Sequence, residues 1–84
     1  MQALVRYTIA DFATFRTAFD ADAEDRGLHG LSLLQLWRES GQSVWALYQV
    51  SDAQAARSYL TVGGAAFAGQ AGVSACDVHF VETA

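Results

Sequence analysis

Two stretches of the chain repeat each other at a fixed offset, and this repeat constrains the fold more than any other feature. A tyrosine, an aspartate and an arginine recur 41 residues apart, in the pairs Tyr7 and Tyr48, Asp11 and Asp52, and Arg16 and Arg57. Because the chain has 84 residues, the offset is close to half its length. So short a chain cannot build a second core. The repeat therefore predicts one domain, residues 1–84, made of two similar strand–helix–strand units.

The first unit shows the pattern clearly. Residues 3–9 mix apolar and polar side chains with β-branched and aromatic members, which predicts a half-buried strand. Asp11 stands where the N-cap of a helix belongs, and Gly27 follows where that helix should end. Within the helix, Asp22 and Arg26 are four residues apart in the favourable acid-first order, so we expect them to pair.

The rest of the chain completes the plan. We expect strands over residues 31–39 and 44–50 with a hairpin loop over 40–43, a helix over 53–60 capped by Asp52, an interruption at Gly63-Gly64, a helical turn over 65–71, and a strand over 76–82. This order, β-α-β-β-α-β, predicts an α+β fold of two layers, in which a four-stranded antiparallel sheet carries both helices on one face.

Composition excludes several classes of function. Five basic residues, all arginine, stand against nine acidic ones, and this balance argues against nucleic acid and against a membrane as partner. The single cysteine, Cys76, excludes an intrachain disulfide, and the two histidines lack the spacing of metal ligands, so we expect no metal and no cofactor. No signal peptide opens the chain and no stretch is long enough to span a membrane, which predicts a cytoplasmic protein.

The hairpin and the repeat together assign the faces of the sheet. A symmetric loop pairs Leu36 with Leu47 and Arg38 with Trp45, and paired residues share a face. The face that should receive the helices is largely apolar: Val5, Tyr7, Ile9, Leu33, Gln35, Trp37, Ala46, Tyr48, Val50, Val78 and Phe80. The other face is mixed: Leu4, Arg6, Thr8, Leu34, Leu36, Arg38, Trp45, Leu47, Gln49, Asp77, His79 and Val81.

That mixed face would be bare in a single copy of the chain. It would expose Trp45 and several leucines as a patch larger than soluble monomers usually tolerate. We therefore expect a symmetric homodimer whose two sheets pack face to face. Its polar residues would then line a cavity between the sheets: Arg6, Thr8, Arg38, Gln49, Asp77 and His79.

Three segments carry a resemblance that covers nearly the whole chain. The helix entries Asp11-Phe12…Phe15-Arg16…Phe19-Asp20 and Val50-Ser51-Asp52-Ala53…Ala56-Arg57…Leu60, and the turn Ala71-Gly72-Val73, resemble the dimeric α+β barrel superfamily. Its members include antibiotic-biosynthesis-type monooxygenases, polyketide cyclase-like proteins and stress-responsive barrel proteins. The resemblance implies a ferredoxin-like protomer, a homodimer and a ligand cavity on the bare sheet face.

The chain also departs from these members. The stress-responsive cyclases place one histidine on the first strand and another after the second helix, where this chain has Leu4-Val5-Arg6 and Gly63-Gly64-Ala65. The cofactor-free monooxygenases use an Asn/Trp/Tyr-type cavity. Trp45 and Tyr48 resemble part of that set, but the chain contains no asparagine.

Each candidate site residue has two interpretations. His79 suits a general base that Asp77 orients, or it is an interface histidine. Arg6 and Arg38 suit a bidentate anion clamp, or they form ion pairs with Asp77 or Glu39. Trp45 could stack on a planar ligand or pack in the dimer interface, and Thr8 and Gln49 complete the polar lining. Tyr7 and Tyr48 are interpreted as core residues.

Two functions therefore remain open. The favoured one is a homodimer that binds a small ligand, or serves as an interaction module, through the cavity between its sheets. The alternative is a metal-free cavity enzyme, monooxygenase-like or cyclase/isomerase-like, that acts on a planar anionic or enolisable small molecule. In that case His79 would be the base, Arg6 and Arg38 the anion clamps and Trp45 the stacking wall.

Overall fold

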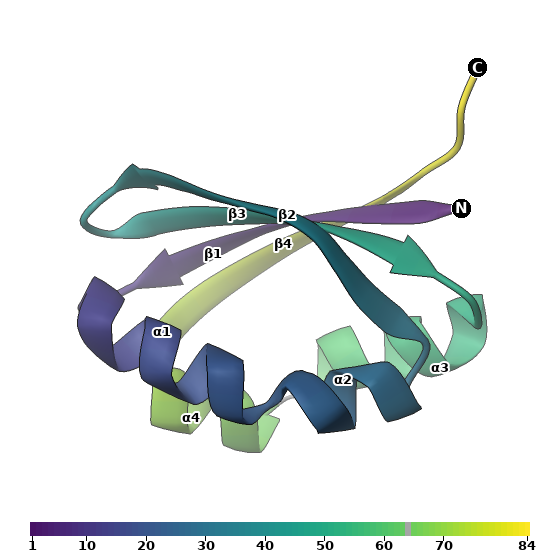
Figure 1. Ribbon diagram of the computed structural model, residues 1–84. Helices are drawn as coiled ribbons and strands as arrows, with labels where there is room; N and C mark the ends of the chain where they lie inside the picture. The colour runs from purple at the N-terminus through teal and green to yellow at the C-terminus, as the bar shows by residue number, and fades with distance from the viewer. Residues whose placement is uncertain (64) are drawn as a thin grey trace.

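The computed structural model describes residues 1–63 and 65–84, and it confirms the predicted two-layer α+β architecture. The sheet is antiparallel with strand order β2-β3-β1-β4, and all the helices cover one of its faces (Figure 1). The elements in chain order are β1 (Gln2–Ile9), α1 (Phe12–Ala21), α2 (Ala23–Leu28), β2 (Leu31–Ser40), β3 (Ser43–Val50), α3 (Ala53–Ser58), the π-helix η1 (Tyr59–Gly63), α4 (Ala65–Ala71) and β4 (Val73–Val81). In the described part of the chain, no helix has the length and apolar content needed to span a membrane.

The repeated aspartates cap the two helices that they were predicted to cap. The carboxylate of Asp11 accepts a hydrogen bond from the N–H of Thr14 at 2.9 Å, and that of Asp52 accepts one from the N–H of Ala55 at 3.0 Å. In both cases the side chain satisfies a donor in the first turn that has no partner inside the helix. The repeat in the sequence therefore reflects a repeated helix start.

Both predicted helices differ from the structure in their second half. The helix expected from Phe12 to Gly27 is broken at Asp22, which ends α1 and precedes α2. Aspartate tends to break a helix because its short polar side chain competes for hydrogen bonds, and here that side chain turns to another element. The helix expected over 53–60 ends at Ser58 and continues as η1, and Gly64 lies outside the described residues. The predicted helical turn over 65–71 is the helix α4.

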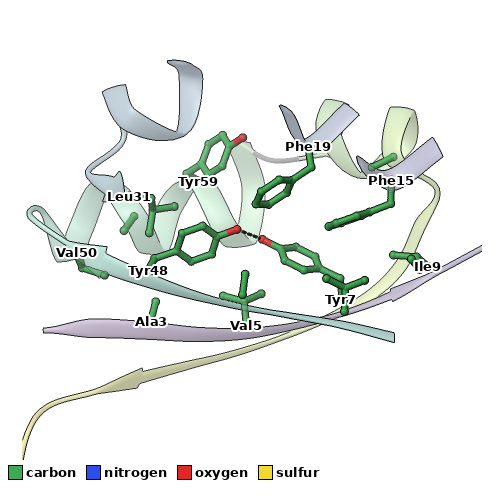
Figure 2. Packing of buried hydrophobic residues seen from close by; sticks show 14 residues of the cluster. Ala3, Val5, Tyr7, Ile9, Phe15, Phe19, Leu31, Tyr48, Val50 and Tyr59 are labelled. Carbon is green, nitrogen blue, oxygen red and sulfur yellow. Dashed lines mark hydrogen bonds between the residues drawn. The ribbon is translucent and has the colours of Figure 1, made fainter. Parts of the chain in front are cut away.

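Aromatic side chains fill the space between the sheet and the helices. Phe15 and Phe19 of α1 stack with ring centroids 5.3 Å apart, and Phe67 of α4 meets both rings edge-on. Tyr7 and Tyr48, at equivalent positions of the two units, bring their hydroxyls together at 2.7 Å (Figure 2). The interpretation of these tyrosines as core residues is confirmed, because both are nearly inaccessible to solvent.

The predicted faces of β1, β3 and β4 are confirmed. Val5 lies opposite Ala46 and Val78, whereas Arg6 lies opposite Trp45 and Asp77 on the side away from the helices. We call that side the open face. The last strand begins at Val73 rather than at residue 76, and its pairing with β1 shifts between Thr8 and Ile9.

The predicted pairing of β2 is wrong by one residue over its outer half. The hairpin turn consists of Gly41 and Gln42 only, since Ser40 pairs with Ser43. The pairing then shifts at Glu39, and again at Leu34, each of which is left over as an extra residue. A one-residue shift exchanges the two faces of a strand.

The shift moves four side chains to the opposite face. Trp37 and Gln35 lie opposite Trp45 and Leu47, and so belong to the open face. Arg38 and Leu36 lie opposite Val44 and Ala46, on the helix side. The predictions for all four positions are therefore wrong, and Arg38 is the predicted ligand residue among them.

Candidate functional site

The structure places six of the seven predicted site residues on the open face: Arg6, Thr8, Trp45, Gln49, Asp77 and His79. They lie in rows that cross the strands. One row runs Trp37, Trp45, Arg6, Asp77 across the four strands, and the next runs Gln35, Leu47, Leu4, His79. Two tryptophans are thus direct cross-strand neighbours, which the sequence did not predict.

Arg6 is held by a polar cluster at the hairpin end of the open face. Its Nε donates to the Ser43 hydroxyl at 3.0 Å and lies 3.8 Å from the Glu39 carboxylate. The same carboxylate oxygen accepts from the Ser43 hydroxyl at 3.1 Å and from the Trp45 indole N–H at 2.6 Å. Of the two interpretations of Arg6, the ion pair with Glu39 is present in the structure.

Arg38 lies on the other side of the sheet from Arg6. Its guanidinium sits over the ring of Phe12, 4.5 Å from the ring centroid. Because Arg6 and Arg38 occupy opposite faces, a single copy of the chain does not assemble the predicted pair as a clamp on one anion.

Asp77 and His79 share a face as predicted, two residues apart on β4 and both exposed. In residues 1–63 and 65–84, no hydrogen bond joins their side chains. Gln49 donates to the Met1 carbonyl at 3.1 Å, and Thr8 lies opposite Ser43. The catalytic roles of His79 and Asp77 stay predictions.

The cluster around Glu39 should respond to acid. The hydrogen bonds from Trp45 and Ser43 lower the pKa of Glu39 below its ordinary value of 4.5. The hydrogen bond from the Trp45 indole to the ionised Glu39 carboxylate is therefore fully present above the ordinary pKa of a glutamate. It is lost as the pH falls through the lowered pKa of Glu39. We expect the Trp45 indole N–H resonance in NMR to titrate with a midpoint below 4.5.

Glu39→Gln provides the control for this titration, since the amide oxygen still accepts a hydrogen bond but does not titrate. A midpoint at or above 4.5 in the unmodified protein would contradict the expected stabilisation of the Glu39 carboxylate.

A second candidate site lies between the helix side of the sheet and the η1–α4 segment. It is a cavity of about 50 Å³, lined by Tyr7, Asp22, Arg26, Tyr59, Leu60, Phe67, Ala68, Val73 and Cys76. An outer groove of about 200 Å³ shares Leu60, Ala68, Val73 and Cys76 with it and runs along β4. A ligand could therefore reach the cavity from the edge of the sheet.

Charged and hydroxyl groups meet in the lining of this cavity. The Tyr59 hydroxyl donates to the Asp22 carboxylate, which lies 3.7 Å from Arg26 Nη1. Arg26 is only 6% exposed, although it carries a full charge. Its Nη1 donates to the Phe19 carbonyl at 2.6 Å, and its guanidinium lies 3.7 Å from the centroid of the Phe19 ring. The predicted pair of Asp22 and Arg26 is thus confirmed, and it belongs to the interior.

The hydroxyl and thiol groups of the cavity keep their protons at neutral pH. Burial raises the pKa of Tyr7 well above its ordinary value, and Tyr48 beside it adds to this effect. Burial, followed by the hydrogen bond to Asp22, also raises the pKa of Tyr59. The pKa of Cys76 rises to about 11, through burial and then the charge of Asp77. Both tyrosines that line the cavity therefore keep their protons, and Tyr59 donates its proton to Asp22.

This site was not predicted from the sequence, because all the predicted site residues were assigned to the open face. Two signals were available. A pair of tyrosines at equivalent positions, both facing the helices, requires partners for two buried hydroxyls. The second signal was the pair of Asp22 and Arg26 near the end of the predicted helix, since such a pair can face the core as well as the solvent. As for metals, the described residues contain no group of three or more histidine, cysteine, aspartate or glutamate side chains suited to hold an ion.

Comparison with known proteins gives a fold and no family. No family model matches the sequence, and no curated protein matches it. Among solved structures, the chain is similar to SnoaB, a cofactor-independent oxygenase from Streptomyces nogalater, with a TM-score of 0.65 and 20% identity over 99% of this chain and 93% of that one. A mutant form of SnoaB gives a TM-score of 0.63 at the same identity and coverage. This likeness shows the ferredoxin-like α+β fold.

Proposed function

We propose that the protein binds a small, mainly apolar molecule in the cavity beneath η1 and α4, with the polar end of the ligand at the Tyr59 and Tyr7 hydroxyls. The observation that supports this best is the combination of an apolar lining with a small group of polar side chains that their contacts with one another hold in place. Small-molecule sites typically have this form, in which apolar walls give affinity and a few oriented polar groups give direction. The π-helix η1, which supplies Tyr59 and Leu60, is itself a form of helix often found at functional sites.

The volumes limit how a ligand would lie. A cavity of about 150 Å³ holds one benzene ring. The inner cavity, at about 50 Å³, takes only a hydroxyl or carbonyl end, whereas the outer groove of about 200 Å³ takes a ring. The proposed ligand therefore spans both, and the walls that they share, Leu60, Ala68 and Val73, contact its middle.

An enzymatic role is the second candidate, and the likeness to SnoaB, described as a cofactor-independent oxygenase, favours it. In such a role Asp22 would accept a proton from an enolisable or phenolic substrate. The Tyr59 hydroxyl, released from the Asp22 carboxylate that this proton neutralises, would then donate its hydrogen bond to the substrate oxygen left negative. Among the described lining residues Asp22 is the one carboxylate, and histidine, the commonest general base, is not among them. We therefore place binding first and metal-free proton-transfer chemistry second.

An NMR titration with 1-naphthol tests the binding proposal. We expect shifts in the amides of Leu60, Val73 and Cys76. Ala68→Phe fills the shared wall and should weaken binding at least about tenfold, since a well-placed ring would lose its space. Ala66→Phe is the matched control, because Ala66 is exposed on the same helix and lines neither hollow. Shifts confined to the open face, or equal effects of the two substitutions, would refute the proposal.

We also propose that a second copy of the chain covers the open face. Trp37, Trp45, Leu47 and Leu4 form an apolar centre, and around it lie Arg6, Asp77, His79 and Gln35. An apolar centre rich in tryptophan with a polar, arginine-containing rim is the usual anatomy of a protein interface. Four strands of about eight residues cover a flat area of roughly 500 Å². The accessible surface of this face is larger than its flat area, because side chains project from it. It is therefore of the same order as the roughly 800 Å² of accessible surface that each partner buries in a standard interface.

This assembly would place Thr8, Gln49, Asp77 and His79 between two sheets, so the ligand and catalytic roles predicted for them depend on it. Sedimentation of the unmodified chain at tens of micromolar tests the premise, with the mass of two copies as the expected result.

A further inference from the structure

The positive charge in the interior cavity is already neutralised. Arg26 and Asp22 lie side by side with side chains only 7% and 15% exposed. Arg26 has a second partner in the Phe19 carbonyl and a third in the face of the Phe19 ring. The pair therefore brings no net charge into the cavity, and the arginine has few directions left in which to bind a ligand anion.

Among the lining residues that the structure describes, the other side chains bring no positive charge either. Tyr7, Tyr59 and Cys76 stay uncharged at neutral pH, because burial raises their pKa values. Beyond Tyr59 lies His29, whose ring stacks on the tyrosine ring with centroids 4.8 Å apart. Its Nδ1 contacts the Asp25 carbonyl at 2.8 Å and lies 3.8 Å from the Asp25 carboxylate. The negative charge of Asp25 therefore lies beside this histidine. Asp77, next to Cys76, adds a further negative charge near β4.

We propose that the cavity selects uncharged ligands that end in a hydroxyl or carbonyl group, and that Asp22 sets this selectivity by cancelling the charge of Arg26. A carboxylate or phenolate ligand would lose its hydration and gain no net positive charge in exchange, and it would also lie near the Asp22 carboxylate. A neutral hydroxyl can donate to the Tyr59 oxygen, whose own proton goes to Asp22. A hydroxyl or a carbonyl can also accept from the Tyr7 hydroxyl when Tyr48 supplies the proton of the bond between the two tyrosines, and neither contact carries that cost. This inference rests on the proposed binding function, and it differs from the anionic ligand expected from the sequence.

Two ligands that share the naphthalene ring and differ in the charge of their polar group test the charge selectivity. At pH 7, 1-naphthol is neutral and 1-naphthoate is an anion. We expect the unmodified protein to bind 1-naphthol at least about tenfold more tightly. Asp22→Asn leaves Arg26 without its carboxylate, so we expect the affinity for 1-naphthoate to rise about tenfold and the preference to shrink or reverse. Tyr59→Phe removes the hydrogen bond to Asp22 but keeps its charge, and should retain the preference for the neutral ligand.

The possible outcomes distinguish the binding function from the charge selectivity. Equal binding of the two ligands by the unmodified protein would overturn the charge selectivity and leave the binding function intact. An unchanged preference in a folded Asp22→Asn variant would overturn the role of Asp22, and if that variant does not fold, Asp22→Ser makes the same comparison. Failure of the unmodified protein to bind either ligand would overturn the binding function and this inference together.

Discussion

Arg26→Met is expected to lower the free energy of unfolding by about 3–5 kcal/mol, the usual cost of removing one partner from a buried ion pair. The substitution leaves the Asp22 carboxylate in the interior without its cation, and it removes the charged donor of the Phe19 carbonyl. An 84-residue domain has roughly 4–13 kcal/mol of stability in total, so the loss is a large share of it. Urea denaturation followed by circular dichroism would measure the change.

Arg16→Met is the matched control. Arg16 and Asp20 have the same four-residue spacing on the neighbouring helix and lie 3.1 Å apart, but their side chains are 50% and 58% exposed. An exposed pair of this kind contributes about 0.3–0.5 kcal/mol. A double variant, Arg26→Met with Asp22→Asn, should recover part of the loss because no unpaired charge remains. If Arg26→Met lowers the free energy of unfolding no more than Arg16→Met does, the Arg26–Asp22 pair does not stabilise the interior.

Local chemistry explains what the sequence could predict. A capping aspartate such as Asp11 or Asp52 acts on the next three residues only, so its effect can be read from the chain itself. The faces of β1 and β3 also follow from the sequence, since apolar and polar residues alternate there and the repeat relates the two strands.

The outer half of β2 could not be predicted in the same way. Leu33, Leu34 and Leu36 are apolar on both sides of the strand, so the alternation does not choose a face. The segment from Ser40 to Ser43 fits a two-residue turn as well as a four-residue loop, and only pairing with β3 decides between them. Glu39 and Leu34 then shift the pairing of β2 with β3, and no feature of the neighbouring sequence predicts these two shifts.

The interior cavity depends on contacts between distant parts of the chain. Asp22 and Tyr59 are 37 residues apart, and their hydrogen bond exists because the break after α1 turns Asp22 toward η1. The spacing of Asp22 and Arg26 predicted that they pair, but it did not tell whether the pair faces solvent or the core. That distinction requires the packing of the helix layer on the sheet.

The second large effect is expected at Trp37, in the apolar centre of the open face. Trp37→Asp should convert the proposed dimer into monomers at tens of micromolar. A tryptophan anchor contributes roughly 2–4 kcal/mol to an interface, and a symmetric dimer loses two of them. The new carboxylate would also be buried without a partner. Sedimentation equilibrium of both proteins would measure the change in dissociation constant.

Leu28→Asp is the control, because Leu28 is 78% exposed against 45% for Trp37 and lies at the end of α2, away from the open face. It should leave the dissociation constant unchanged. A monomeric unmodified protein, or a Trp37→Asp variant that still sediments as two copies, would show that this face is not the interface.

Trp37→Asp also separates the two possible pairings of β2. In the pairing expected from the sequence, Trp37 would point under the helices, and an aspartate there would be buried in the core and unfold the protein. In the observed pairing Trp37 lies beside Trp45 on the open face of each protomer, so the variant should keep its secondary structure while losing its partner. A folded monomer would therefore support the observed pairing and the proposed interface in one experiment, whereas an unfolded chain would argue against both.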